Sequence, residues 1–90
     1  MITLEEARDY LRQSSHDDDD LIEGLIRTAE KIVMDTARID EEGLEKNSDT
    51  TYGACLYTLA YLYEHREEAD HHALTLDLRS LLFGVREAAF

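Results

Sequence analysis

The amino-acid sequence predicts an all-α protein: a small four-helix domain with a long third helix and a short C-terminal helix. The 90 residues include no proline and only four glycines, and a β architecture needs more of these turn-forming residues. Apolar residues recur at spacings of three and four, and helix-capping residues separate these patterns. The length suits one domain, so residues 1–90 are predicted to form a single unit.

The first predicted helix begins after Thr3. Thr3 is followed three residues later by Glu6, the spacing of a capping box, in which each side chain bonds the other residue's backbone N–H. Leu4, Ala7 and Leu11 then share one face of the helix. The polar residues 13–16 are predicted to end it.

The second predicted helix has the most regular pattern. Four consecutive aspartates, Asp17–Asp20, lie where a helix N-terminus favours negative charge, and Ser15 or an aspartate is the expected cap. The apolar residues that follow occupy about 140° of the helix circumference: Leu21, Ile22, Leu25, Ile26, Ala29, Ile32 and Val33. The pattern ends near Thr36. Residues 38–47 are polar and are predicted to be a surface loop, with room for a short turn of helix.

The third predicted helix begins at Ser48 or Asp49 and runs to about Ala69. It is apolar on two sides, which is typical of a helix at the centre of a domain or against a neighbouring subunit. The main stripe is Tyr52, Cys55, Leu56, Leu59, Leu62 and Tyr63, and the opposite side carries Ala54, Tyr57 and Tyr61.

The tyrosines of this helix divide into two groups. Tyr52 and Tyr63 lie on the main stripe, where we expect core packing with the hydroxyl at the edge. Tyr57 and Tyr61 lie one turn apart on the other side and, with Ala54, are candidates for a subunit interface.

The fourth predicted helix is short. Thr75 or Asp77 is its expected cap, and its expected buried face is Leu78, Leu81, Leu82 and Val85. Phe83 falls outside that stripe and is a further interface candidate.

The charge balance excludes several classes of function. Nine basic residues against 21 acidic ones give a net charge of −12, which repels nucleic-acid phosphates and anionic lipid surfaces. An acidic surface can instead mimic nucleic acid or line a pore through which DNA slides, and composition does not choose between these roles. No secretory signal and no membrane-spanning run is visible, and the single cysteine suits a reducing cytoplasm.

Two patterns invite a metal-site interpretation, and each fits poorly. Counted from Asp17, the sixth and twelfth positions of a calcium loop are Ile22 and Thr28, where glycine and glutamate are needed. The histidines do not have the spacing that places two imidazoles on one helix face; they are His65, His71 and His72. Cys55 lies on an apolar stripe, where a thiol is structural. We therefore expect no metal, no cofactor and no catalysis.

Four segments together resemble a known family. They are Ile2–Arg12, Leu21–Ala29, Leu62–Glu67 and Leu78–Arg86. In this order, over nearly the whole chain, they are similar to the small head–tail connector (adaptor) proteins of tailed bacteriophages and prophages. The chain departs from that family around residues 38–47. Members often have a proline before the third helix and a glycine closing the second, and this chain has neither there.

The resemblance implies a structural protein. Such subunits form a ring homo-oligomer that docks under the portal protein and extends the DNA channel towards the stopper or tail-completion protein. DNA passes without specific binding, and no membrane is involved. The expected location is the host cytoplasm during assembly and then the head–tail junction of the virion.

Site residues follow from combining that implication with helical geometry. The subunit interface is predicted at Tyr57, Tyr61, Ala54 and Phe83, and the channel-lining or partner-facing acids at Asp40, Glu41, Glu42 and Glu45. The main alternative is an acidic helical regulator, which would be a DNA mimic or an inhibitor of a basic partner. A metal-dependent enzyme would need a stoichiometric metal at His65, His71 or His72.

Overall fold

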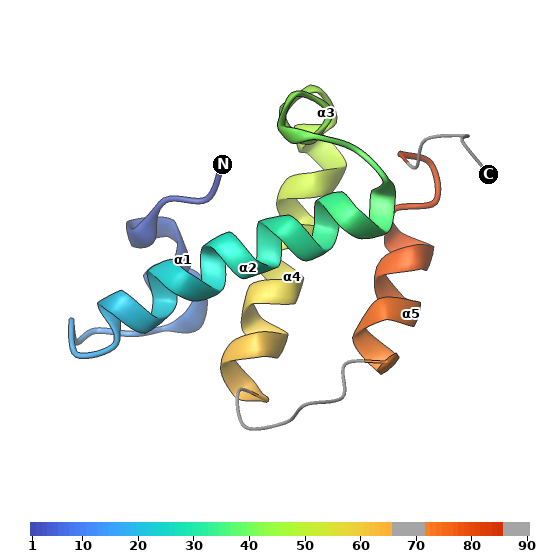
Figure 1. The fold of residues 1–90 in the computed structure, drawn as a ribbon. Coiled ribbons are helices and arrows are strands. Elements are labelled where there is room, and N and C mark those ends of the chain that lie inside the picture. Colours follow the sequence, from blue (N-terminus) through green and yellow to red (C-terminus); the bar gives the residue numbers. More distant parts are fainter. Residues whose placement is uncertain (66–71, 86–90) are drawn as a thin grey trace.

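The computed structural model describes residues 1–65 and 72–85, and these form helices without a strand. Figure 1 shows α2 crossing α4 near the middle of the molecule, with α1 and α5 on opposite sides of that crossing. The all-helical class predicted from the sequence is confirmed. The helices are α1 (Leu4–Leu11), α2 (Asp19–Ala37), α3 (Glu41–Lys46), α4 (Ser48–Glu64) and α5 (His72–Leu81).

Helix α4 is the centre of the fold. It packs against each of the other four described helices, most extensively against α2. Its buried residues cover more than one side of the helix: Thr51, Ala54, Cys55, Thr58, Leu59 and Leu62. They join one apolar core with residues of the other helices, including Ile22, Leu74 and Leu78. The two-sided apolar pattern therefore reflects a central position in the domain.

Helix α1 forms as its sequence predicts. The Thr3 hydroxyl accepts from the Glu6 amide at 3.1 Å, and the Glu6 carboxylate accepts from the Thr3 amide at 2.9 Å. Arg12 ends the helix in the left-handed conformation, with φ of 59°. The hydroxyl of Tyr52 donates to Glu6 at 2.9 Å and so ties α4 to the start of α1.

Helix α2 begins in the acidic turn, but no side chain caps it. Asp18 occupies the N-cap position, and its carboxylate accepts instead from the Tyr63 hydroxyl at 2.9 Å. The hydroxyl of Ser15, the other expected cap, accepts from the amide of Asp17, which precedes the helix. The predicted side-chain cap is therefore wrong, because the aspartate at the cap is used for a tertiary contact.

The predicted loop 38–47 is largely helical. The Asp40 carboxylate caps α3 by accepting from the Gly43 amide at 2.9 Å. Leu44, within α3, is the buried residue of this helix. Gly43 permits a close approach, since a Cβ there would lie 2.8 Å from the Cβ of Ile39. The polar composition suggested a loop, whereas a local cap and a single apolar anchor are enough for a helix of six residues.

Helix α5 begins earlier than predicted. Thr75 and Asp77, the expected caps, lie inside it. Its buried residues are Leu74 and Leu78, and Leu82 is buried directly after the helix. These three are spaced by four, so Leu81 points away from the core and is exposed. The third predicted helix, α4, ends at Glu64 with His65 as its C-cap, so the predicted end near Ala69 is wrong. Ala69, His71 and Arg86 lie outside the described residues.

Thr51 links α3 to α4 through a buried hydrogen bond, and this predicts its effect on stability. Its hydroxyl lies 2.7 Å from the carbonyl of Leu44 and 3.1 Å from that of Asn47. We expect Thr51→Val to lower the free energy of unfolding by about 1–3 kcal/mol, because a buried carbonyl loses its donor. Denaturant unfolding followed by circular dichroism measures this change.

Thr58→Val is the matched control. Thr58 is equally buried, but its hydroxyl donates at 2.8 Å to Ala54, a carbonyl one turn earlier in the same helix. We expect this substitution to cost less than about 1 kcal/mol. Equal losses in the two variants would contradict the linking role of Thr51.

Candidate interaction surface

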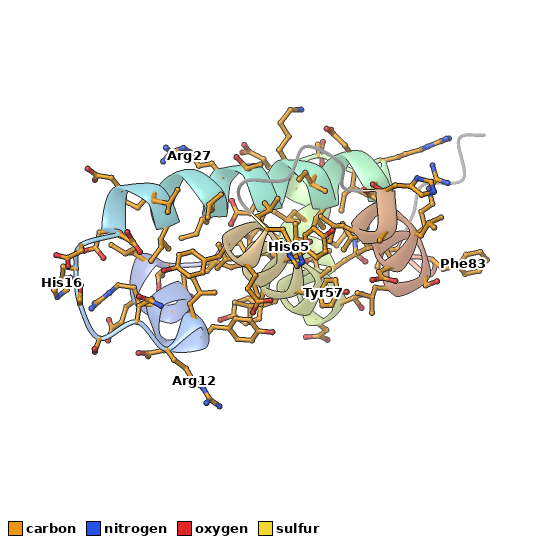
Figure 2. The ribbon with its side chains drawn as sticks, turned by 90° about the horizontal axis from the view of Figure 1, so that it is seen from below. Arg12, His16, Arg27, Tyr57, His65 and Phe83 are labelled. Carbon is orange, nitrogen blue, oxygen red and sulfur yellow. The ribbon has the colours of Figure 1, made fainter. Side chains whose placement is uncertain are left out.

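Exposed apolar side chains gather on α5 and on the adjoining side of α4. Phe83 is 81% exposed, and Leu76 and Leu81 are each 49% exposed. Figure 2 shows Phe83 projecting from the end of the molecule, away from the rest of the chain. The expectation that Phe83 lies off the buried stripe is confirmed, and its side chain is free to contact another molecule.

The outer side of α4 carries no charge. Between Asp49 and Glu64 the sequence has no charged residue, although part of this stretch faces solvent. Gly53 and Tyr57 are exposed and Leu56 and Ala60 are half-buried, and the four lie within about 100° of the helix circumference. We call these four residues the uncharged face. Desolvating it costs no buried charge, so it is suited to contact with another protein surface.

Tyr57 is held in place at this surface. It is 37% exposed, and its hydroxyl donates to the Asp77 carboxylate of α5 at 2.7 Å. That hydrogen bond raises the pKa of Tyr57, with burial and the charge of Asp77 acting in the same direction. Asp77 thus fixes the ring of Tyr57 between α4 and α5, where Figure 2 shows it.

The other predicted interface residues on α4 are less exposed than Tyr57. Tyr61, one helical turn after Tyr57, is half-buried and stacks on His65, with ring centroids 4.2 Å apart. Ala54 is only 2% exposed and lies in the core of its own chain. The assignment of Ala54 to a subunit interface is therefore wrong, because the core of its own chain encloses the side chain.

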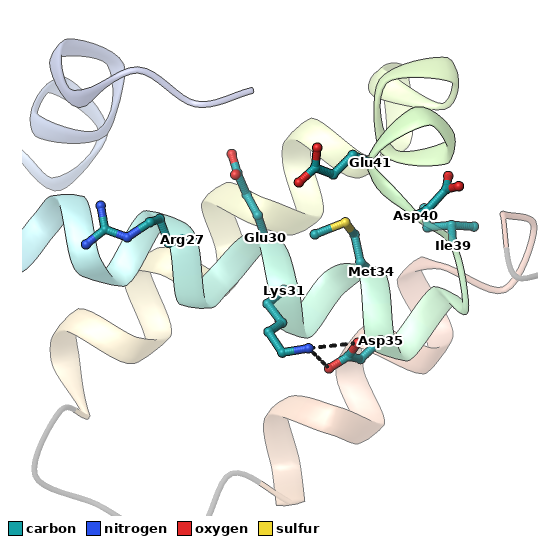
Figure 3. A pocket seen from close by; sticks show the side chains of 8 residues that line it. All are labelled: Arg27, Glu30, Lys31, Met34, Asp35, Ile39, Asp40 and Glu41. Carbon is teal, nitrogen blue, oxygen red and sulfur yellow. Dashed lines mark hydrogen bonds and ion pairs between the residues drawn. The ribbon is translucent and has the colours of Figure 1, made fainter.

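The predicted partner-facing acids lie on and before α3. Asp40, Glu41, Glu42 and Glu45 are all exposed, and the Asp40 carboxylate is used as the α3 cap. A groove of about 500 Å³ separates α3 from α2, with Met34 between charged side chains of both signs (Figure 3). Its lining is Arg27, Glu30, Lys31, Met34, Asp35, Ile39, Asp40 and Glu41. Lys31 pairs with Asp35 at 3.2 Å within its own helix, and the lining as a whole mixes four acids with two bases.

A second cleft collects positive charge on an otherwise acidic chain. It has a volume of about 240 Å³ and lies between the C-terminal end of α2 and α5. We call it the arginine cleft; it is lined by Asp35, Thr36, Arg38, Thr75 and Arg79. Sequence reasoning missed it, because Arg38 and Arg79 are far apart in the chain and only the packing of α5 on α2 brings them together.

Cys55 and the possible metal ligands are the described side chains considered for chemistry. Cys55 is fully buried, and this burial raises the pKa of its thiol to about 12, with the charge of Glu30 adding to the effect. Its predicted place in the core is confirmed. Within residues 1–65 and 72–85, no group of three His, Cys, Asp or Glu side chains is placed to hold a metal ion.

The chain matches no protein-family model, no curated protein and no solved structure. Among the described helices, none combines the length and the apolar character needed to cross a membrane.

The raised pKa of Cys55 predicts a loss of stability in alkali. The thiol has an ordinary pKa of 9.0 when unfolded and about 12 when folded, so between these values only the unfolded chain ionises. We expect stability to fall by up to about 1.4 kcal/mol per pH unit from this group. Unfolding of the wild type and of Cys55→Ala across that range isolates it, because the raised pKa values of Tyr52 and Tyr57 are common to both. Parallel pH profiles would contradict the prediction.

Proposed function

We propose that the chain is a structural subunit of a phage head–tail connector ring, which docks under a portal protein and extends the DNA channel towards the stopper or tail. The observations that carry this proposal are the uncharged face of α4 and the exposed apolar side chains of Leu76, Leu81 and Phe83. Such a surface on a chain of net charge −12 is best explained by a protein partner. The sequence resemblance supplies the kind of assembly.

The acidic surface supports the same function. A channel wall that repels phosphate lets a genome slide without sticking. The exposed acids on and before α3 are the proposed channel-lining or partner-facing residues: Asp40, Glu41, Glu42 and Glu45. Together with the absence of catalysis expected from the sequence, this describes a passive structural element.

The acidic regulator is the second candidate, and net charge alone favours it. A DNA mimic or an inhibitor of a basic partner binds through its carboxylates. That role leaves the uncharged face without a use. Competition with DNA for a basic protein, lost on replacing the acids of α3, would favour the regulator over the connector.

Genetics tests the connector function. In the genome that encodes the chain, deleting its gene should give DNA-filled heads without tails in electron micrographs. Tailed, infectious particles from the deletion would contradict the proposal. Wild-type gene supplied from a plasmid should restore infectivity.

Gly53 provides a sharp test of the uncharged face. A Cβ at this position meets nothing within 4 Å, so side chains are accepted without strain. We expect Gly53→Lys to abolish plasmid rescue, because it places a charge in the contact, while Gly53→Ala rescues fully. Gly24→Lys, which adds the same charge on α2, is the control for net charge and should also rescue.

A further inference from the structure

We propose that the groove between α2 and α3 receives a lysine side chain of a partner protein. This is the groove of about 500 Å³ that contains Met34, and we call it the methionine groove. The inference rests on the proposed function and deepens it, because it assigns Glu41 to contact with a protein and not to the channel wall. The partner is identified by its chemistry, which is an ammonium group at the end of an apolar stem.

The methionine groove has an apolar floor. Met34 and Ile39 line it, and both are half-buried, so part of each side chain is accessible. A smaller hollow of about 250 Å³ shares Met34 with the groove and adds Met1 and Leu44. A lysine stem buries its methylene groups on such a floor while the charged end stays at the rim. Methionine suits this contact because its unbranched side chain adapts to irregular apolar shapes.

Carboxylates from both walls face the space beside Met34. Figure 3 shows the side chains of Glu30, Met34 and Glu41 extending from α2 and α3 into the space between the two helices. Glu41 is exposed, and within the described part of the chain its side chain has no hydrogen-bond or ion-pair partner. An ammonium group has three donors that can reach carboxylates on both walls, whereas a planar guanidinium group matches a single carboxylate best. The groove therefore favours lysine over arginine.

The two bases in the lining do not neutralise this space. The ammonium of Lys31 lies 3.2 Å from Asp35, one turn later in α2, and Figure 3 shows this pair pointing away from Glu41. Arg27 extends back along α2, since a Cβ at Gly24 would lie 3.8 Å from its guanidinium group. The carboxylates beside Met34 thus give the groove a local negative charge.

An ammonium group of the chain itself already lies beside the groove. The N-terminal ammonium of Met1 is 3.5 Å from Glu30 and 3.9 Å from Glu45, so carboxylates of both α2 and α3 hold it. The two helices thus form one ammonium site of the proposed kind. Glu41 lies one turn before Glu45 on α3 and is available for a second ammonium group. Three carboxylates for two ammonium groups leave no excess positive charge.

A second copy of the chain is a poorer occupant than a basic partner. The only lysines of the chain are Lys31 and Lys46. Lys31 pairs within its own helix, and Lys46 follows the exposed acids Glu42 and Glu45 on α3. Its approach to the groove of another copy would bring acids against acids. A partner with a basic surface is instead attracted by the net charge of −12.

A peptide titration followed by NMR tests the groove. The probe is a capped five-residue peptide with a central lysine between leucine and alanine residues. It is titrated into ¹⁵N- and methyl-labelled wild type at about 0.15 M ionic strength, where long-range attraction is screened. Saturable shifts should centre on the methyl groups of Met34 and Ile39 and on the Gly43 amide.

The same peptide with norleucine in place of lysine is the control for charge. Norleucine keeps the apolar stem but has no ammonium group, so this peptide should bind at least about tenfold more weakly. Equal binding of the two peptides, or no saturable shift with the lysine peptide, would overturn the proposal.

Glu41→Gln and Glu42→Gln are matched variants. Both positions are exposed in the first turn of α3 and lose the same charge, but of the two only Glu41 lines the groove. We expect Glu41→Gln to weaken binding of the lysine peptide about three- to tenfold, and Glu42→Gln to keep the wild-type affinity. Equal weakening would indicate general attraction to an acidic chain and would remove the site.

Concentrating the chain without peptide tests the other occupant. Shifts at Met34, Ile39 and Gly43 on concentration would assign the groove to Lys46 of a second copy and would overturn the partner assignment. The gene deletion decides the connector function independently, because its phenotype does not depend on which side chain the groove receives.

Discussion

The structure depends on the burial of one uncharged helix. Residues 50–63 carry no charge in a chain with 33% charged residues. Burying this segment removes apolar surface from water without desolvating a charge, so its burial is favourable. The other helices arrange themselves around it, and each brings an apolar stripe to α4. Four described neighbours do not enclose it completely, and the remaining outer side becomes the uncharged face. The core and the candidate interface are thus two consequences of the same sequence feature.

Tyrosine–carboxylate hydrogen bonds hold the surrounding helices to α4. Tyr52 donates to Glu6 of α1, Tyr57 to Asp77 of α5 and Tyr63 to Asp18 at the start of α2. A chain with more than twice as many acids as bases has few cations available for ion pairs. Tyrosine hydroxyls are uncharged donors. A hydrogen bond from a hydroxyl to a charged carboxylate is stronger than one between two neutral groups. The abundant carboxylates thereby contribute to the fold.

Local signals predicted most of the fold. The capping box at Thr3, the 3.6-residue period of α2 and the two-sided pattern of α4 each depend on residues close together in the sequence. The errors arose where tertiary contacts decide. Asp18 was expected to cap α2 or to leave that role to Ser15, yet it accepts from Tyr63, 45 residues away. Leu81 belongs to the leucine stripe predicted from the sequence, but the residues that face the core are Leu74, Leu78 and Leu82.

The candidate site was less predictable for the same reason. Exposure of Phe83 follows from its place off a local stripe, but burial of Ala54 depends on how the other helices pack around α4. The arginine cleft has no local signature at all, because it joins residues 38 and 79. Single-sequence periodicity assigns a residue to a side of a helix, whereas only the packed structure shows which side another helix covers.

Self-association and a charge of −12 are compatible because they act over different distances. At physiological ionic strength, repulsion between whole copies is screened beyond about 8 Å, which weakens it without abolishing it. Burial of exposed apolar side chains acts only at direct contact between copies and is not screened by salt. Residual repulsion then disfavours rings in dilute solution. Binding to a common docking site raises the effective concentration of neighbouring copies and offsets that repulsion. In the proposed connector, the acidic surface therefore delays ring closure until subunits meet at their docking site, and the same charge afterwards keeps DNA from binding the channel wall.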